Sequence, residues 1–229
     1  MKFSFSVLVM GDSAIKNVIT EFGEPKRIFV SPFGSYREFY PNQISRKNAR
    51  NNLGLSPSNR LFLFFGTAHS NRNPVELIQA FRSFSNPNIR LIVAATWYAE
   101  KTRREILEAV KNDDRITTQF DLIPPEKAEV LFKAADFVAL PSHYYLTSGV
   151  IVTSLSFGCP VIAEEYGCAP SQIRDAGFIY DSKDEDGLMN ALQQAVECDV
   201  DEYKRRAQRI SEALSWNLCA QKIAEAYRS

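Results

Sequence analysis

Short apolar segments alternate with longer amphipathic or polar segments along almost the whole chain. The apolar runs have the length of strands, and the segments between them have the roughly ten to fifteen residues of helices. The predicted strands are 27–31, 60–65, 90–95, 116–120, 137–140, 161–163 and 177–180. The predicted helices cover 45–53, 74–84, 100–111, 125–134, 150–157, 184–198 and 201–228. This order predicts an α/β protein with a doubly wound, Rossmann-like parallel sheet and helices on both faces.

Composition and charge narrow the function classes. The chain has 229 residues, of which 45% are hydrophobic, so it can bury a large core. Its 27 basic and 27 acidic residues balance, which argues against a dedicated nucleic-acid surface. No apolar run is long enough to be a transmembrane segment, and the first ten residues lack a secretory cleavage site. We expect a cytoplasmic protein, with peripheral attachment to a membrane as the alternative.

Cysteine and histidine usage gives no sign of a metal site. The four cysteines form no Cys-x-x-Cys pair and lie in or beside apolar or helical segments. Buried, reduced thiols are therefore expected instead of disulfides or metal ligands. The chain has only two histidines, His69 and His143, and no metal or cofactor is predicted.

The strongest chemical signal lies between residues 134 and 167. A buried strand, 137–140, is followed by Thr147, Ser148 and Gly149 and then by an apolar helix that ends at Gly158. Free backbone amides and the positive end of a helix dipole meet at such a turn, which favours an anion such as phosphate. The alternative is a simple N-cap in which Ser148 satisfies an amide of its own helix.

A second loop of interest follows the strand 60–65. It holds Gly66 for close approach of a ligand, Thr67 as a hydrogen-bond donor and Arg72 as a forked cation. In a parallel sheet this loop and the 147–149 turn lie at the same edge, so together they predict a diphosphate clamp. His69 is predicted to orient a phosphate oxygen. The alternative for Arg72 is a solvated surface side chain.

The order of motifs resembles the donor-sugar half of the GT-B glycosyltransferases, closest to the retaining family 4 type, or group 1. The motifs are FLFFGT, Arg-Asn before LIQAF, LFKAADFVALPS, LSFGCPVIAEEYG, and ALSW with AEAY near the end. The resemblance implies the C-terminal half of a GT-B fold. It also implies a nucleoside-diphosphate sugar as donor, a glycan or lipid-linked acceptor, and a role in polysaccharide biosynthesis.

The family's functional residues transfer only in part. Its glycine-arginine pair stands here as Gly66-Thr67, while Arg72 keeps the position of the second cation. The two family glutamates around donor sugar and ribose fall on Tyr145 and Thr153, which can hydrogen-bond hydroxyls only as neutral groups. The turn with Gly149 keeps its backbone role.

Three further side chains lie near this site, and each has two interpretations. Glu164 and Glu165 either substitute for the missing glutamates or form a solvated pair at the end of a strand. His143 either contacts donor or acceptor or is ordinary polar surface. No side chain is an evident nucleophile or base, so no catalytic residue is predicted.

The resemblance divides the chain into three parts. Residues 1–25 correspond to the end of an acceptor-binding domain, 26–205 to the nucleotide-sugar domain, and 206–229 to a helix that crosses back toward the acceptor side. One hypothesis is a glycosyltransferase completed by an acceptor-domain partner chain or cut from a longer protein. The others are a non-catalytic nucleotide-sugar-binding or regulatory module and, more distantly, a phosphorylase or epimerase on the same architecture.

Overall fold

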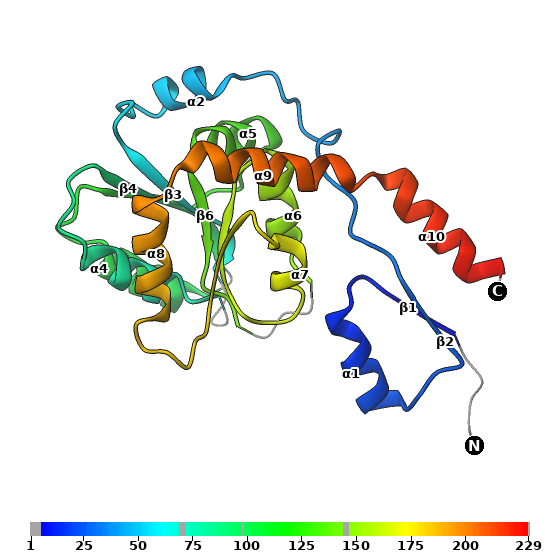
Figure 1. The fold of residues 1–229 in the computed structure, drawn as a ribbon. Coiled ribbons are helices and arrows are strands. Elements are labelled where there is room, and N and C mark those ends of the chain that lie inside the picture. Colours follow the sequence, from blue (N-terminus) through cyan, green and yellow to red (C-terminus); the bar gives the residue numbers. More distant parts are fainter. Residues whose placement is uncertain (1–5, 69–71, 98, 144–146, 229) are drawn as a thin grey trace.

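The computed structural model describes residues 6–68, 72–97, 99–143 and 147–228, and its centre is a parallel sheet (Figure 1). Six strands lie in the order β5-β4-β3-β6-β7-β8. Their bounds are Arg60–Ala68 for β3, Ile89–Trp97 for β4, Ile116–Gln119 for β5, Phe137–Leu140 for β6, Val161–Glu164 for β7 and Gly177–Tyr180 for β8. Every pairing is parallel. The prediction of a doubly wound Rossmann-like sheet is confirmed.

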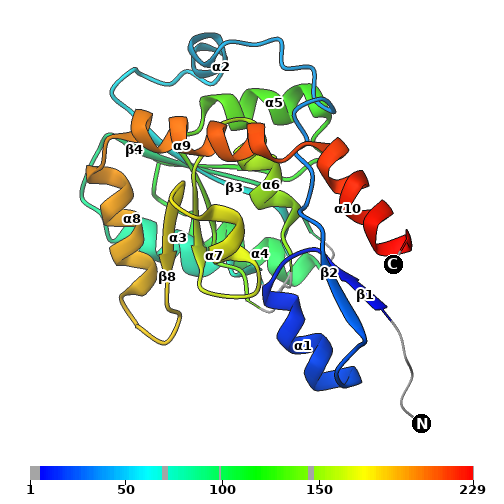
Figure 2. The same cartoon turned by 45° about the vertical axis from the view of Figure 1, so that its right-hand side comes forward.

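Helices cover both faces of the sheet, giving three layers (Figures 1 and 2). One face packs against α2 (Arg46–Asn52), α5 (Pro125–Ala134), α6 (Gly149–Ser156), α7 (Ala169–Ile173) and α9 (Val200–Ala213). The other packs against α3 (Pro74–Arg82), α4 (Glu100–Ala109) and α8 (Gly187–Glu197). The predicted elements of this region form with small shifts at their ends, and the five-residue α7 is the one that the sequence pattern missed.

Side chains of the central strand β3 point alternately to the two faces of the sheet and contribute to a hydrophobic core on each face. In β3, Leu61 and Leu63 belong to the core under α5 and α6, while Phe62 and Phe64 belong to the core under α3 and α8. Successive side chains of a strand point to opposite faces, so one apolar strand can supply both layers. All four residues of β6 are buried, as expected for a strand covered on both faces.

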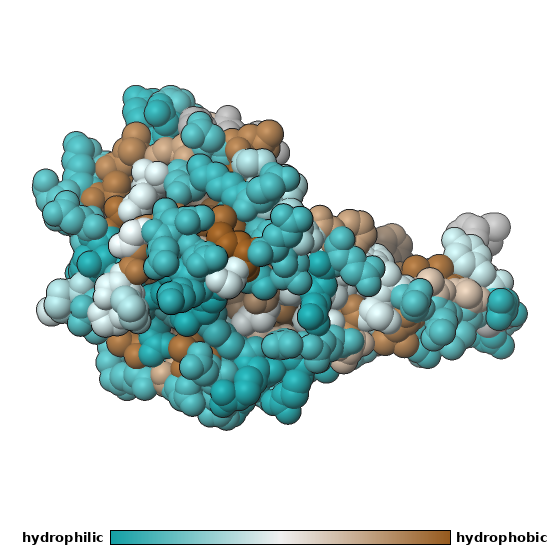
Figure 3. Space-filling view, turned by 90° about the horizontal axis from the view of Figure 1, so that it is seen from above, coloured by the Kyte–Doolittle hydropathy of each residue, from teal (hydrophilic) through white to brown (hydrophobic). Residues whose placement is uncertain are grey.

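The N-terminal residues form a separate small unit with the C-terminal helix. Strands β1 (Ser6–Val9) and β2 (Arg27–Val30) pair in parallel and are joined by α1 (Ser13–Phe22). Helix α10 (Trp216–Arg228) contacts both strands. Together these elements project as an arm beside the main lobe, and the arm exposes hydrophobic and hydrophilic residues side by side (Figures 1 and 3).

The C-terminal segment 201–228, predicted as one helix, forms two. Helix α9 continues through residue 206 and ends at Ala213, and α10 starts at Trp216. The break falls at Leu214 and Ser215, between α9 and α10. The Trp216 indole donates to the Ser35 carbonyl at 2.8 Å, which holds the start of α10 against the chain that follows β2.

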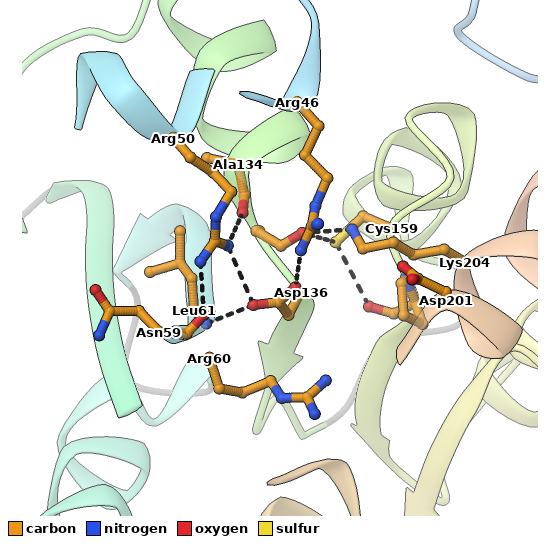
Figure 4. Close-up of polar contacts among 12 residues, drawn as sticks. Arg46, Arg50, Asn59, Arg60, Leu61, Ala134, Asp136, Cys159, Asp201 and Lys204 are labelled. Atoms are coloured by element: carbon orange, nitrogen blue, oxygen red, sulfur yellow. Dashed lines mark hydrogen bonds and ion pairs between the residues drawn. The ribbon is translucent and has the colours of Figure 1, made fainter. Parts of the chain in front are cut away.

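A buried carboxylate joins the two central strands near their N-terminal ends (Figure 4). The Asp136 side chain is buried, with the residue 2% exposed, and its carboxylate accepts a hydrogen bond from the backbone amide of Leu61 at 2.7 Å. The backbone amide of Asp136 donates to the Leu61 carbonyl at 2.8 Å. Two arginines of α2, Arg46 and Arg50, pair with its carboxylate. Arg50 also donates to the carbonyls of Ala134 and Asn59, at 3.0 and 2.6 Å. One acid therefore connects β3, β6 and α2.

A partly buried lysine extends this cluster to α9. The Lys204 ammonium donates to the Ala135 carbonyl at 2.6 Å, next to Asp136 in the chain (Figure 4). Burial lowers the pKa of this ammonium, and the nearby Cys159 thiol and Asp136 carboxylate act in the opposite direction. The helix that leads into the C-terminal crossing is thus held to the same point of the sheet.

Replacing Asp136 by asparagine should destabilise the protein strongly. The amide can still accept from Leu61, but Arg50, 6% exposed, would remain buried without its counter-charge. Breaking a buried pair from one side costs about 3–5 kcal/mol. Urea unfolding monitored by circular dichroism should show a lower midpoint with an unchanged slope.

A matched control is Arg37→Ala. Arg37 pairs with Glu212 at 3.2 Å, with side chains 43% and 49% exposed, so its loss should cost less than about 1 kcal/mol. Equal effects of the two substitutions would show that Asp136 does not hold the strands as inferred.

Candidate functional site

The candidate site lies where the strand order reverses. Strands β3 and β6 pair only at Phe62 with Phe137 and Leu63 with Val138. Beyond these pairs β3 leads to α3 on one face of the sheet, and β6 leads to α6 on the other. Crossovers that leave in opposite directions open a crevice at the carboxyl ends of the two strands, and this is where ligands of doubly wound sheets bind.

Gly66 lies near the end of β3, next to both Arg72 and the start of α6. Its φ of 123° lies in a region that other residues rarely adopt. The position of a Cβ on Gly66 would be 3.5 Å from Nη1 of Arg72 and 3.5 Å from Cγ2 of Val150. The guanidinium of the β3–α3 loop and the first turn of α6 therefore meet above the same peptide unit, although they are far apart in sequence.

The start of α6 supplies the amides on the opposite side. The Ser148 hydroxyl accepts from the Ile151 amide at 3.3 Å, so Ser148 is the N-cap. Its own amide donates to Oε1 of Gln172 in α7 at 3.4 Å. Within the described ranges, the amides of Gly149 and Val150 donate to no acceptor. The Ser148 amide and hydroxyl therefore both make hydrogen bonds inside the protein, in contrast to the next two amides.

One cleft contains both halves of the predicted clamp. It has a volume of about 510 Å³, and its lining residues are Tyr36, Phe39, Tyr40, Arg72, Pro125, Gly149, Val150 and Thr153. A Cβ added to Gly149 would meet nothing within 4 Å, so the backbone there faces open space. The structure thus brings Arg72 and the 147–149 turn together, while the diphosphate that they are expected to hold remains a prediction.

Thr153 lines the same cleft one helical turn further along α6. Its hydroxyl donates to the Gly149 carbonyl at 2.8 Å, and the residue is 7% exposed. Burial raises the pKa of the neighbouring Tyr40 phenol, and a hydrogen bond with Thr153 partly opposes this shift. Both groups are neutral near pH 7, so this part of the cleft provides neutral donors and acceptors where a carboxylate would carry charge.

The remaining residues that were predicted to bind the donor do not line the cleft or are not described by the structure. Thr67 lies in β3 opposite Thr96, and Thr147 is partly buried before α6; neither is among the residues that line the cleft. His69 and Tyr145 fall outside the residues that the structure describes.

His143 and Glu164 form a polar pair that the sequence did not connect. Glu164, 5% exposed, accepts from the Ser182 hydroxyl at 2.5 Å and also contacts Nδ1 of His143. The interpretation of Glu164 and Glu165 as a solvated pair is correct for Glu165, which is exposed, and wrong for Glu164. Nε2 of His143 lies 4.0 Å from Glu76 of α3. A separate cavity of about 690 Å³ is lined by this pair with Glu165, Tyr166, Asp181, Ser182 and Lys183.

The aromatic residues of the cleft were also missed. Tyr36, Phe39 and Tyr40 follow β2 in a loop, more than a hundred positions before α6 in the chain. Residues 33–40 contain four aromatic rings, which is an unusual density for a loop. This density was the signal in the sequence that could have pointed to an aromatic wall of the cleft.

The cysteines, the possible metal ligands and the length of the helices bear on which class of protein this is. All four cysteines are free, and three are buried, in agreement with the expected reduced thiols. Among the described residues, no group of His, Cys, Asp or Glu is arranged to hold a metal ion. None of the described helices is both long and apolar enough to cross a membrane.

Comparison with known proteins agrees with the fold. A family model described as glycosyl transferases group 1 matches residues 45–215. The D-inositol 3-phosphate glycosyltransferase of Rhodococcus erythropolis is 28% identical over 218 residues, covering 90% of this chain and 49% of the relative. The protein of that name from Mycobacterium sp. strain KMS is 30% identical over 168 residues, covering 70% and 37%. The chain thus spans about half the length of these relatives, or less.

Solved structures show the same fold at low identity. A glycosyltransferase from Rickettsia africae superposes with a TM-score of 0.83 at 14% identity, covering 97% of this chain and 62% of the other. Anabaena HepE in complex with UDP gives a TM-score of 0.81 at 20% identity, covering 96% and 63%. These are GT-B proteins, so the sheet and its helices form a GT-B Rossmann-like domain.

Substituting Gly149 tests the site without reference to any particular sugar. A valine at this position would project its branched side chain into the open space beside the Gly149 and Val150 amides. Affinity for inorganic pyrophosphate, measured by isothermal titration calorimetry, should fall at least about ten-fold, because one lost charge-assisted hydrogen bond is worth about 1.5–3 kcal/mol.

The alanine variant separates blocking from unfolding. Gly149→Ala adds one methyl group in open space and should leave the melting temperature unchanged or slightly raised. Its loss of pyrophosphate affinity should be smaller than that of Gly149→Val. Unchanged affinity in the valine variant would refute the anion site.

Proposed function

Because the chain belongs to the group 1 glycosyltransferases, we propose that it binds a nucleoside-diphosphate sugar and serves its transfer to an acceptor hydroxyl, with retention of anomeric configuration. The single observation that carries this proposal is the cleft shared by Arg72 and the start of α6. A forked cation and unpartnered helix amides match the geometry and charge of two linked phosphoryl groups.

The same groups would act on the rate of the reaction. As the bond to the sugar breaks, negative charge accumulates on the departing diphosphate. Arg72 and the amides of Gly149 and Val150 are held in place before the reaction, so they would stabilise that charge without reorganising. They would thus contribute to catalysis as well as to binding.

The acceptor and the second wall of the site belong to the same proposal. The chain covers 49% of the Rhodococcus relative, and the arm of β1, β2 and α10 lies beside the nucleotide domain. We infer that an acceptor-binding part, carried by the same protein or by a partner chain, would close the cleft from this side. A glycan or lipid-linked hydroxyl compound would bind there.

A non-catalytic nucleotide-sugar-binding module is the second candidate. Thr153 favours it, because a neutral hydroxyl that is already bonded to Gly149 replaces a family carboxylate. The two functions differ in turnover. Each of UDP-, GDP-, ADP- and TDP-sugars is incubated with the protein, with and without added acceptors. Release of the nucleoside diphosphate as the sugar passes to water or to an acceptor supports the enzyme. Tight binding without release supports the module.

Substitution of Arg72 tests the proposed role of the cleft. Arg72→Ala should weaken binding of a nucleoside diphosphate by roughly ten- to hundred-fold, because hydrogen bonds to charged groups contribute about 1.5–3 kcal/mol. Binding of the corresponding free nucleoside should change little. Both affinities can be measured by isothermal titration calorimetry for each nucleotide of the panel.

Arg82→Ala is the matched control, since it removes the same charge from the far end of α3, where Arg82 donates to the Ala109 carbonyl. Its nucleotide affinities should equal those of the wild type. Equal losses for nucleoside and nucleoside diphosphate in Arg72→Ala would mean that Arg72 does not contact phosphate.

A further inference from the structure

Aromatic side chains form one wall of the cleft that holds the candidate anion site. Tyr36, Phe39 and Tyr40 line it together with Arg72 and Gly149. The order along α6 separates the two kinds of surface. Gly149 is at the start of the helix, Thr153 lines the cleft with Tyr40 one turn later, and the Tyr40 ring packs on Phe157, with centroids 4.9 Å apart, after a further turn. With a rise of about 1.5 Å per residue, Tyr40 lies roughly 6–12 Å along the helix from the amides.

The rings of this wall are held in place. Tyr36 and Phe39 pack edge to face with centroids 5.8 Å apart, and Phe39 packs in the same way on Trp216 at 5.9 Å. Trp216 is fixed in turn by its hydrogen bond to the Ser35 carbonyl. Phe39 is nevertheless 64% exposed. An exposed ring with supported edges offers a flat apolar surface that loses little conformational entropy when a ligand covers it.

These observations describe a site for a ligand with a charged end and a flat end. The charged end would meet Arg72 and the helix amides, and the flat end would meet the rings, with Thr153 and Tyr40 offering neutral hydrogen bonds between them. The volume of about 510 Å³ is in the usual range for a small-molecule site. A nucleoside diphosphate has this shape, since its ribose separates a planar base from two phosphoryl groups.

We propose that Tyr36, Phe39 and Tyr40 form the platform on which the base of the nucleoside diphosphate stacks. This inference rests on the proposed function and names the part of the donor that the aromatic wall recognises. It also accounts for a site that lacks a carboxylate at position 153, because stacking supplies affinity that charged hydrogen bonds to the ribose would otherwise provide. Every base has an aromatic face, so this platform tolerates different bases.

The test compares ligands that contain only one end of the donor. Inorganic pyrophosphate reports the anion site, a free nucleoside reports the platform, and UDP, GDP and ADP report both. In Phe39→Ala, the nucleoside and the nucleoside diphosphates should lose affinity by the same factor, roughly five- to hundred-fold from the worth of one stacked base. Pyrophosphate affinity should not change. Phe39→Tyr, which keeps the ring, should restore binding to near the wild-type level.

Phe22→Ala is the matched control. Phe22 is another exposed phenylalanine, 72% accessible on α1, and is not among the described residues that line the cleft. Its substitution should leave all affinities unchanged. Melting temperatures for each variant exclude loss of fold as the cause, since a side chain as exposed as Phe39 contributes little to the core.

Two results would overturn the inference, and they differ. If Phe39→Ala binds nucleoside diphosphates as the wild type does, while Arg72→Ala does not, the platform is refuted and the proposed function stands. A loss in Phe39→Ala that appears only with an acceptor substrate also refutes it, because the wall then serves the acceptor. If the wild-type chain binds neither pyrophosphate nor any nucleoside diphosphate, the proposed function fails and the platform fails with it.

Discussion

The buried Asp136 carboxylate is the interaction on which the geometry of the domain depends. It ties the amide of Leu61 in β3 to the start of β6 and is neutralised by two arginines of α2. A buried acid is tolerated only where its charge is paired and its oxygens are hydrogen-bonded, and both conditions hold here. The pairing of β3 with β6 therefore begins at a defined register, and the two strands stay together for only a short distance.

That register decides what happens at the opposite ends of the strands. Since β3 and β6 send their helices to different faces, the chain leaves a crevice between Gly66 and the start of α6. Burial stabilises the N-terminal ends of the two strands, while exposed backbone amides and a guanidinium gather at their carboxyl ends. The buried charge cluster and the open cleft thus lie at the two ends of the same strand pair.

The cleft combines polar and aromatic groups from distant parts of the chain. The Thr153 hydroxyl donates within α6, while aromatic rings from the segment after β2 line the same space. Among the described residues that line the cleft, Arg72 is the one charged side chain, and the others are neutral or aromatic. His143 and Glu164 line a separate polar cavity at the ends of β6 and β7, where the Glu164 carboxylate contacts the His143 ring and the Ser182 hydroxyl.

Periodicity alone was sufficient to predict the sheet, because a strand that is buried on both faces must be continuously apolar, as Phe137–Leu140 is. Residue types pointed to the Gly149 turn and to Arg72, which line one cleft in the structure, since glycine, a hydroxyl cap and a cation are recognisable without knowing their neighbours. Helix α7 was missed because five residues are too few to display a helical repeat. The contacts of Phe39 with Trp216 and of His143 with Glu164 could not be read from the chain, because they join residues that are adjacent only after folding. A linear pattern records which residues are apolar or polar, whereas the partner of each side chain is chosen by packing among segments distant in the sequence.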